Sequence, residues 1–167
     1  MRLPNSQQKA GFSLIETTVA AAIAATFLAS LFTMNVATMD TIRAAKESIA
    51  ASQILQQRME SLRIANWHQV TDAVWLRDNL LNAQAAGTAP LKGLVETLII
   101  VPYANPGAGT TQLQRSGGTA TIVSQNAALL AENAVKILWT VNYTGSPNSQ
   151  SITRQIVTIL AKGGVAK

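Results

Sequence analysis

The chain has 167 residues, a formal net charge of +5 at pH 7 and no cysteine. This length allows one domain of modest size, and the missing cysteine excludes disulfide bonds, thiolate metal sites and cysteine catalysis. A positive surplus this small and scattered does not by itself indicate a nucleic-acid-binding surface.

The first segment, residues 1–11, is short, polar and basic. Arg2 and Lys9 carry its positive charges, and Pro4 disfavours a helix at its start. A basic segment followed by an apolar one is what the export machinery recognises. Because positive residues stay on the cytoplasmic side, we expect the chain beyond Met39 to lie outside the cytoplasm.

An apolar run follows from Gly11 to Met39. From Phe12 onward it contains one charged residue, Glu16, and neither proline nor glycine. A helix of this length, rising about 1.5 Å per residue, crosses a hydrocarbon core of roughly 30 Å. The run therefore predicts a membrane-spanning helix over residues 12–39.

Three kinds of N-terminal segment compete for this run. A cleaved signal peptide fits poorly, because the run is too long and no small-x-small cleavage site precedes Asp40. A plain membrane anchor fits the length but gives the Glu16 carboxylate no partner, which is costly in an apolar helix. If Glu16 instead reaches the interface, its carboxylate stays in water.

The segment Lys9–Glu16, which reads KAGFSLIE, resembles the processing signature of type IV prepilins. The resemblance implies that a membrane-embedded prepilin peptidase cleaves after Gly11 and that Phe12 becomes the N-methylated first residue. It also implies that Glu16 neutralises the amino group of Phe12 on a neighbouring subunit in a filament. This third kind of segment accounts for both the Gly11–Phe12 junction and the glutamate.

The sequence departs from many major pilins at Thr33, where those proteins carry a helix-loosening proline. This departure favours a minor subunit. The segment Ala51–Arg63 is similar to PilV-like minor pilins and to the I-type minor pseudopilin of type II secretion.

From Asp40 to Ile64 charged residues return while helical periodicity continues, which predicts one helix of roughly 80 Å over Phe12–Ile64. Apolar and small residues spaced by three and four predict the face that packs on a globular domain: Ile42, Ala45, Ile49, Ser52, Leu55, Met59 and Leu62. The charged residues are expected on the other faces: Arg43, Lys46, Glu47, Arg58, Glu60 and Arg63.

The segment Asn66–Gln69 is expected to end this helix, and a short helix is expected over residues 71–83. Thr71 is its predicted cap, and Val74, Leu76, Leu80 and Leu81 are its predicted inward residues. His68, the sole histidine, has no carboxylate cluster nearby and is expected at the surface. Asp72, Asp78 and Asn79 lack the dense spacing of a calcium loop, so we expect no metal site.

An antiparallel sheet is expected over residues 94–161. Its predicted strands are Leu94–Tyr103, Thr119–Ser124, the alternating run Val135–Tyr143, and Ser151–Ala161. Residues 85–92 are expected to form a linker, and Asn105–Gly118, which contains Pro106 and four glycines, to form a long loop. Trp139 is expected in the core.

The predicted architecture is α+β: a pilin-like fold whose long N-terminal helix packs its second half on a small antiparallel sheet. The predicted parts are a leader at 1–11, a membrane or filament-core helix at 12–39 and a globular head at 40–167. The resemblance implies a structural subunit of a type IV pilus-like filament or type II secretion pseudopilus.

The resemblance further implies a non-enzymatic protein without a cofactor. Its partners would be the prepilin peptidase and methyltransferase, other pilin or pseudopilin subunits and an inner-membrane assembly platform. It would lie in the bacterial inner membrane and then in a periplasmic or extracellular filament. The alternatives are a tip-located binding module for DNA or a surface, and a plain membrane-anchored protein.

Overall fold

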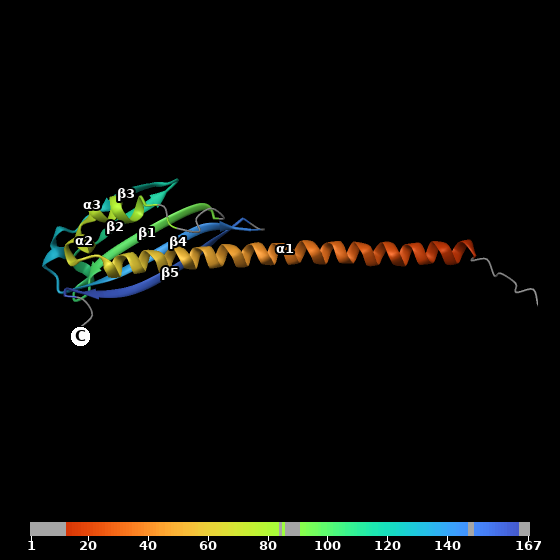
Figure 1. The fold of residues 1–167 in the computed structure, drawn as a ribbon, viewed down its shortest axis with the longest axis horizontal. Coiled ribbons are helices and arrows are strands. Elements are labelled where there is room, and N and C mark those ends of the chain that lie inside the picture. Colours follow the sequence, from red (N-terminus) through yellow and green to blue (C-terminus); the bar gives the residue numbers. More distant parts are fainter. Residues whose placement is uncertain (1–12, 84, 86–90, 147–148, 164–167) are drawn as a thin grey trace, which may run out of the picture. The chain divides into compact units, whose positions relative to one another are not determined.

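A computed structural model describes residues 13–83, 85, 91–146 and 149–163 of the chain (Figure 1). The chain divides into two compact units, Met1–Thr41 and Ile42–Lys167. A long N-terminal helix and a five-stranded antiparallel sheet give the α+β architecture that the sequence predicts.

The helical elements are α1 (Leu14–Ile64), α2 (Trp67–Thr71), α3 (Ala73–Trp75), the π-helix η1 (Leu76–Leu81) and the 3₁₀ turns η2 (Pro106–Ala108) and η3 (Ala127–Ala131). The strands are β1 (Lys92–Pro102), β2 (Thr111–Ser116), β3 (Thr119–Ser124), β4 (Ala134–Gly145) and β5 (Gln150–Ala161).

Helix α1 contains neither proline nor glycine, so nothing in its sequence interrupts the backbone hydrogen-bond ladder. It ends at Ile64, as predicted, and Asn66 then caps the start of α2. The Asn66 side chain accepts a hydrogen bond from the Gln69 backbone, and the Gln69 side chain accepts one from the Asn66 backbone. This reciprocal cap fixes where the new helix starts.

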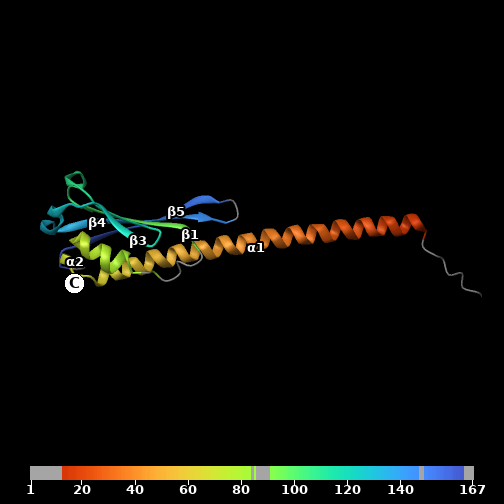
Figure 2. The ribbon, with the colours of Figure 1, turned by 90° about the horizontal axis from the view of Figure 1, so that it is seen from above.

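The sheet has the strand order β3-β2-β1-β4-β5. Its central strands β1 and β4 pair so that Leu98 lies opposite Trp139, and Trp139 lies opposite Ile156 of β5. Alternate residues of β4 are buried, as their spacing predicts, and Trp139 has no exposed surface. Within the second unit, the later turns of α1 and the short helix α2 lie against one face of the sheet (Figure 2). The core therefore lies between that face and the helices.

The face of α1 that packs on the sheet differs from the predicted one. Ile42 and Ile49 are 43% and 58% exposed, and Ala45 and Ser52 are exposed as well. Two charged residues, Glu47 and Arg58, were expected on solvent-facing sides but are buried. The buried face runs along Glu47, Ala50, Ala51, Ile54, Leu55, Arg58, Met59 and Leu62. Leu55, Met59 and Leu62 are therefore buried as predicted. The rest of the prediction failed because alanines and the charged residues Glu47 and Arg58, rather than Ile42 and Ile49, occupy this face.

The single short helix predicted over 71–83 is confirmed in part: helical residues run without a break from Ala73 to Leu81 through α3 and η1, but Thr71 belongs to α2. The segment contains the end of α2, then α3 and then η1, because Asp72 adopts an extended conformation and its side chain accepts a hydrogen bond from the Val74 amide. Thr71 is therefore no cap; its hydroxyl donates to the Trp67 carbonyl. Leu76, Leu80 and Leu81 are buried as predicted, but Val74 is 46% exposed.

The long loop predicted over Asn105–Gly118 is also wrong, because it contains strand β2. Only one of the three inward residues of β2, Leu113, is a hydrocarbon side chain, which weakened the strand signal. Gly117 and Gly118 form the turn into β3 with φ of 58° and 88°, a backbone that glycine adopts without strain. Strand β3 has the predicted bounds. The predicted linker at 85–92 ends one residue early, since Lys92 begins β1, and residues 86–90 lie outside the described residues.

Candidate functional site at the start of helix α1

The predicted processing site falls at the edge of the described chain. Gly11 and Phe12 lie outside the described residues, which begin at Ser13. The predicted leader, residues 1–11, lies outside them as well. The site is therefore described through Ser13, Glu16 and the helix that follows them.

Ser13 and Glu16 form a reciprocal cap at the start of α1. The Ser13 hydroxyl oxygen accepts from the Glu16 amide at 3.3 Å, and a Glu16 carboxylate oxygen accepts from the Ser13 amide at 3.4 Å. The sequence Ser-x-x-Glu is the signature of this capping box. The contact keeps a carboxylate at the positive end of the helix dipole, where negative charge is stabilised. Sequence reasoning gave Glu16 a role toward a neighbour and missed this contact within the chain.

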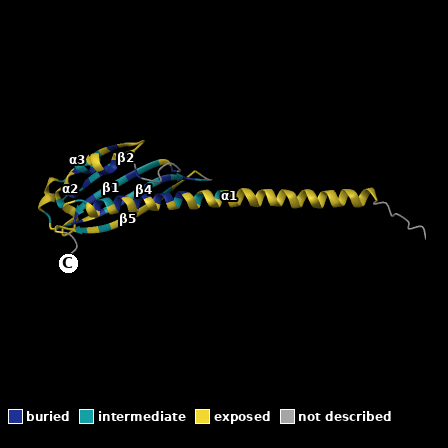
Figure 3. Cartoon of the chain, viewed as in Figure 1, coloured by how far each residue is buried: buried dark blue, intermediate teal, exposed yellow. Residues whose placement is uncertain are grey.

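The first part of α1 exposes its apolar side chains. Every described residue from Ser13 to Met39 is exposed, and the helix is coloured accordingly in Figure 3. The large exposed hydrophobic residues in this part are Leu14, Ile15, Val19, Ile23, Phe27, Leu28, Leu31, Phe32, Met34, Val36 and Met39. By length and composition α1 is the one helix among the described residues that can cross a membrane. An apolar surface of this extent marks a segment that meets lipid or protein rather than water.

The hydroxyl groups in this part of α1 are bonded within the helix. All seven serine and threonine hydroxyls from Leu14 to Thr41 donate to a backbone carbonyl three or four residues earlier. The side chains are Thr17, Thr18, Thr26, Ser30, Thr33, Thr38 and Thr41. A hydroxyl that is already bonded costs much less to transfer into an apolar environment than a free one. The helix surface is therefore more apolar than its composition indicates.

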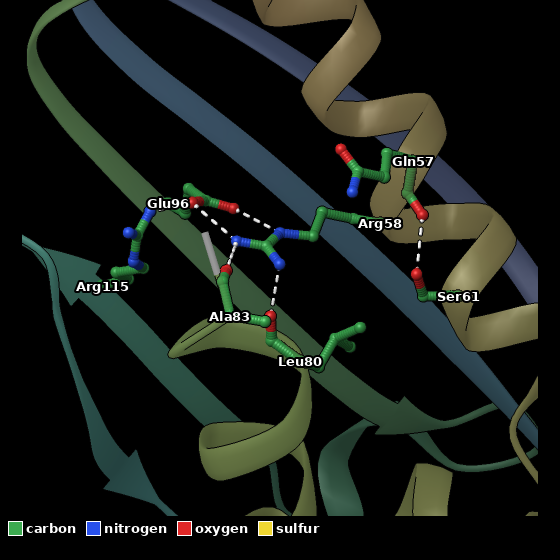
Figure 4. A network of polar contacts seen from close by, with 7 residues as sticks. All are labelled: Gln57, Arg58, Ser61, Leu80, Ala83, Glu96 and Arg115. Carbon is green, nitrogen blue, oxygen red and sulfur yellow. Dashed lines mark hydrogen bonds and ion pairs between the residues drawn. The ribbon is translucent and has the colours of Figure 1, made fainter. Parts of the chain in front are cut away.

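A buried ionic cluster in the second unit was missed by the sequence analysis (Figure 4). Arg58 on α1 pairs with Glu96 on β1, and Arg115 on β2 pairs with the same carboxylate at 2.8 Å. Glu96 is fully buried, and Arg58 and Arg115 are 3% and 12% exposed. A signal was present, since Glu96 shares the inward alternation of Leu98 and Ile100. A charged residue at an inward strand position requires a buried partner.

A second buried carboxylate, Glu47, joins α1 to the turn between β4 and β5. Its Oε2 accepts a hydrogen bond from the Ser146 amide at 2.9 Å. On the next residue, the Ser48 hydroxyl accepts from Arg154 of β5 at 3.0 Å. These contacts hold the helix to one end of the sheet.

The other polar residues considered from the sequence do not gather at one common site. His68 is exposed, as expected. Asp72 caps α3, and Asp78 pairs with Arg77, whose hydrogen bond lowers the pKa of the Asp78 carboxyl below its usual value. Asn79 donates to the Trp75 carbonyl. Among the described residues, no group of three histidine, aspartate and glutamate side chains gathers as a metal site.

No family model, curated protein or solved structure matches this chain.

Proposed function

We propose that this chain is a type IV prepilin-like protein, whose mature form is a minor structural subunit of a pilus-like filament or a type II secretion pseudopilus. Cleavage after Gly11 and methylation of Phe12 would produce the mature form. The first part of α1 then serves as a membrane anchor before assembly and as filament core afterwards.

The observation that carries this proposal is the exposed apolar part of α1 together with Glu16 at its start. In water these side chains would be unfavourably hydrated, so they require lipid or neighbouring helices. In the bilayer they meet acyl chains, and in an aqueous filament the same surface has to pack against other subunits. A plain anchor needs the apolar surface and a helix cap, but a neutral glutamine would complete that cap, so the negative charge of Glu16 is not required for anchoring.

Glu16 supplies a specific contact in this assembly. We propose that its carboxylate pairs with the amino group of Phe12 on the neighbouring subunit, since two buried opposite charges stabilise each other where either alone is costly. The capping box with Ser13 keeps this carboxylate at the helix start while the subunit waits in the membrane. The protein performs no catalysis in this scheme; the prepilin peptidase and methyltransferase act on it.

The mass of the mature N-terminus tests the proposal. The full chain is expressed in cells with an active prepilin peptidase, purified from membranes and digested for mass spectrometry. We expect an N-terminal peptide that begins at Phe12 and carries one added methyl group. A chain that still begins at Met1 in these cells, while a known prepilin in the same cells is cleaved, would refute the proposal.

A further inference from the structure

The buried ionic cluster of the second unit holds two guanidinium groups and one carboxylate. The guanidinium group of arginine is a cation in proteins. Glu96 is the only acidic side chain paired with Arg58 or Arg115 among the described residues. The cluster therefore carries one positive charge in excess. An excess charge in a protein interior is unfavourable unless acceptors or a counter-ion compensate it.

The two arginines differ in how many hydrogen-bond acceptors their guanidinium groups contact. Arg58 donates to both carboxylate oxygens of Glu96, to the Leu80 carbonyl and to the Ala83 carbonyl. Arg115 donates from Nη1 to Glu96, and its buried Nε has no hydrogen-bond partner in the described part of the chain. A buried donor without an acceptor costs free energy, so the unbalanced charge belongs to Arg115.

Arg115 lines a surface pocket of about 460 Å³. The pocket lies where β1 begins and where β2 turns into β3, and its other lining residues are Gly93, Leu94, Ser116, Gly117 and Gly118. None of these lining residues is acidic, and three of them lack a side chain, which leaves the backbone accessible. The pocket thus has room for a small group and is lined by the positively charged Arg115, and none of its lining residues is negatively charged.

We propose that this pocket binds a carboxylate group, with Arg115 as its main contact. A guanidinium offers planar N–H donors that match the two oxygens of a carboxylate. One carboxylate balances the single excess charge of the cluster, whereas a phosphate dianion would overcompensate it. The group can belong to a small free acid or to an aspartate or glutamate side chain of a partner protein. This inference does not depend on the proposed prepilin function.

A titration followed by NMR tests the proposal on the full chain in detergent micelles, with ¹⁵N-labelled backbone and arginine side chains. The probes are sodium acetate, the peptide N-acetyl-Gly-Glu-Gly-amide, its glutamine counterpart and inorganic phosphate, all at constant ionic strength. We expect acetate and the glutamate peptide to shift the Gly117, Gly118 and Arg115 Nε signals. Tighter binding of the peptide assigns the site to a protein partner, and tighter binding of acetate assigns it to a small acid.

Two variants control the experiment. Arg115→Met removes the cation while Arg58 still neutralises Glu96, and we expect binding at least about tenfold weaker. Ser116→Leu leaves the ionic cluster intact and obstructs the pocket, so it should weaken binding as well. The proposal is overturned if the pocket signals do not move, if the glutamine peptide shifts them equally, if phosphate binds more tightly than both carboxylates, or if Arg115→Met binds like the unaltered chain.

Discussion

Arg58 of α1 and Glu96 of β1 lie 38 positions apart in the sequence and meet through two hydrogen bonds, Nε to Oε2 at 3.0 Å and Nη2 to Oε1 at 3.1 Å. The guanidinium also lies 5.8 Å from the centre of the Trp139 ring. The helix and the sheet are thus joined by a buried ion pair as well as by apolar packing.

Replacing Arg58 with methionine should destabilise the second unit strongly. The Glu96 carboxylate would keep only Arg115, and the Leu80 and Ala83 carbonyls would lose their donor. Breaking a buried ion pair lowers the free energy of unfolding by about 3–5 kcal/mol. Because Arg115 still neutralises Glu96 in this variant, we expect a loss near the lower limit of this range. Urea unfolding of the chain in micelles, followed by tryptophan fluorescence, measures it.

The matched control is Arg63→Met on the same helix. Arg63 is 64% exposed and lies 3.8 Å from Glu60, so its loss should change the free energy of unfolding by less than about 0.5 kcal/mol. Equal effects of the two substitutions would contradict the structural role of the Arg58–Glu96 pair.

Glu47→Ala should loosen the turn between β4 and β5. The substitution removes the acceptor of the Ser146 amide, a loss of about 1–2 kcal/mol for a buried hydrogen bond. Hydrogen exchange at the Ser146 amide should become about tenfold faster or more, while exchange in the centre of β1 stays the same. Lys46→Ala, at the exposed neighbouring position, is the control, and Glu47→Gln should restore most of the protection. Unchanged exchange in Glu47→Ala would show that the contact does not hold the turn.

Variants of Glu16 separate its contact within the helix from its proposed contact with a neighbour. Glutamine at this position of a capping box still accepts the Ser13 amide but carries no charge. Under the proposed function, Glu16→Gln and Glu16→Val should both be cleaved and both be poorly incorporated into filaments. Immunoblots of sheared filaments against whole cells measure incorporation.

Ser13→Ala is the control for helix capping. It removes the hydroxyl acceptor of the Glu16 amide, at a cost of about 1 kcal/mol, and leaves the carboxylate charge in place. We expect its incorporation to stay close to that of the unaltered chain. Normal incorporation of Glu16→Gln would mean that Glu16 serves only as a cap.

Phe27→Lys should oppose membrane insertion of the first part of α1. Phe27 is 62% exposed and lies near the middle of the predicted span. A lysine at the centre of a spanning helix raises the insertion free energy by about 3 kcal/mol relative to phenylalanine. A glycosylation-based insertion assay measures this shift. Thr26→Val is the control, and it should insert at least as well because the Thr26 hydroxyl is already bonded within the helix. Equal insertion of Phe27→Lys and the unaltered segment would contradict a spanning role.

The α+β architecture could be predicted because its signals are strong and local. The long run without proline or glycine predicts α1, and the alternation around Trp139 predicts β4. Both patterns reflect backbone geometry that the side chains follow directly. The same reasoning missed β2, where Thr111, Leu113 and Arg115 point inward and only one of them is a hydrocarbon side chain.

Glu47 and Arg58 could not be placed from the sequence for a different reason. Glu47 and Arg58 are unfavourable in a core when each is considered alone. Their partners, Ser146 and Glu96, become neighbours only through the tertiary fold. A periodicity argument assigns charged residues to water and has no means of pairing residues distant in sequence. The isoleucines Ile42 and Ile49 were assigned to the core by the same argument.

The self-bonded hydroxyls of α1 have a thermodynamic consequence for assembly. Since the seven side chains donate to carbonyls of their own helix, removing the lipid around them breaks none of these hydrogen bonds. Under the proposed function, moving these groups from the bilayer into a filament would replace their lipid neighbours by protein neighbours and would break no hydrogen bond. Such a helix can pass between two apolar surroundings in either direction without losing these hydrogen bonds, as the proposed move from bilayer to filament requires.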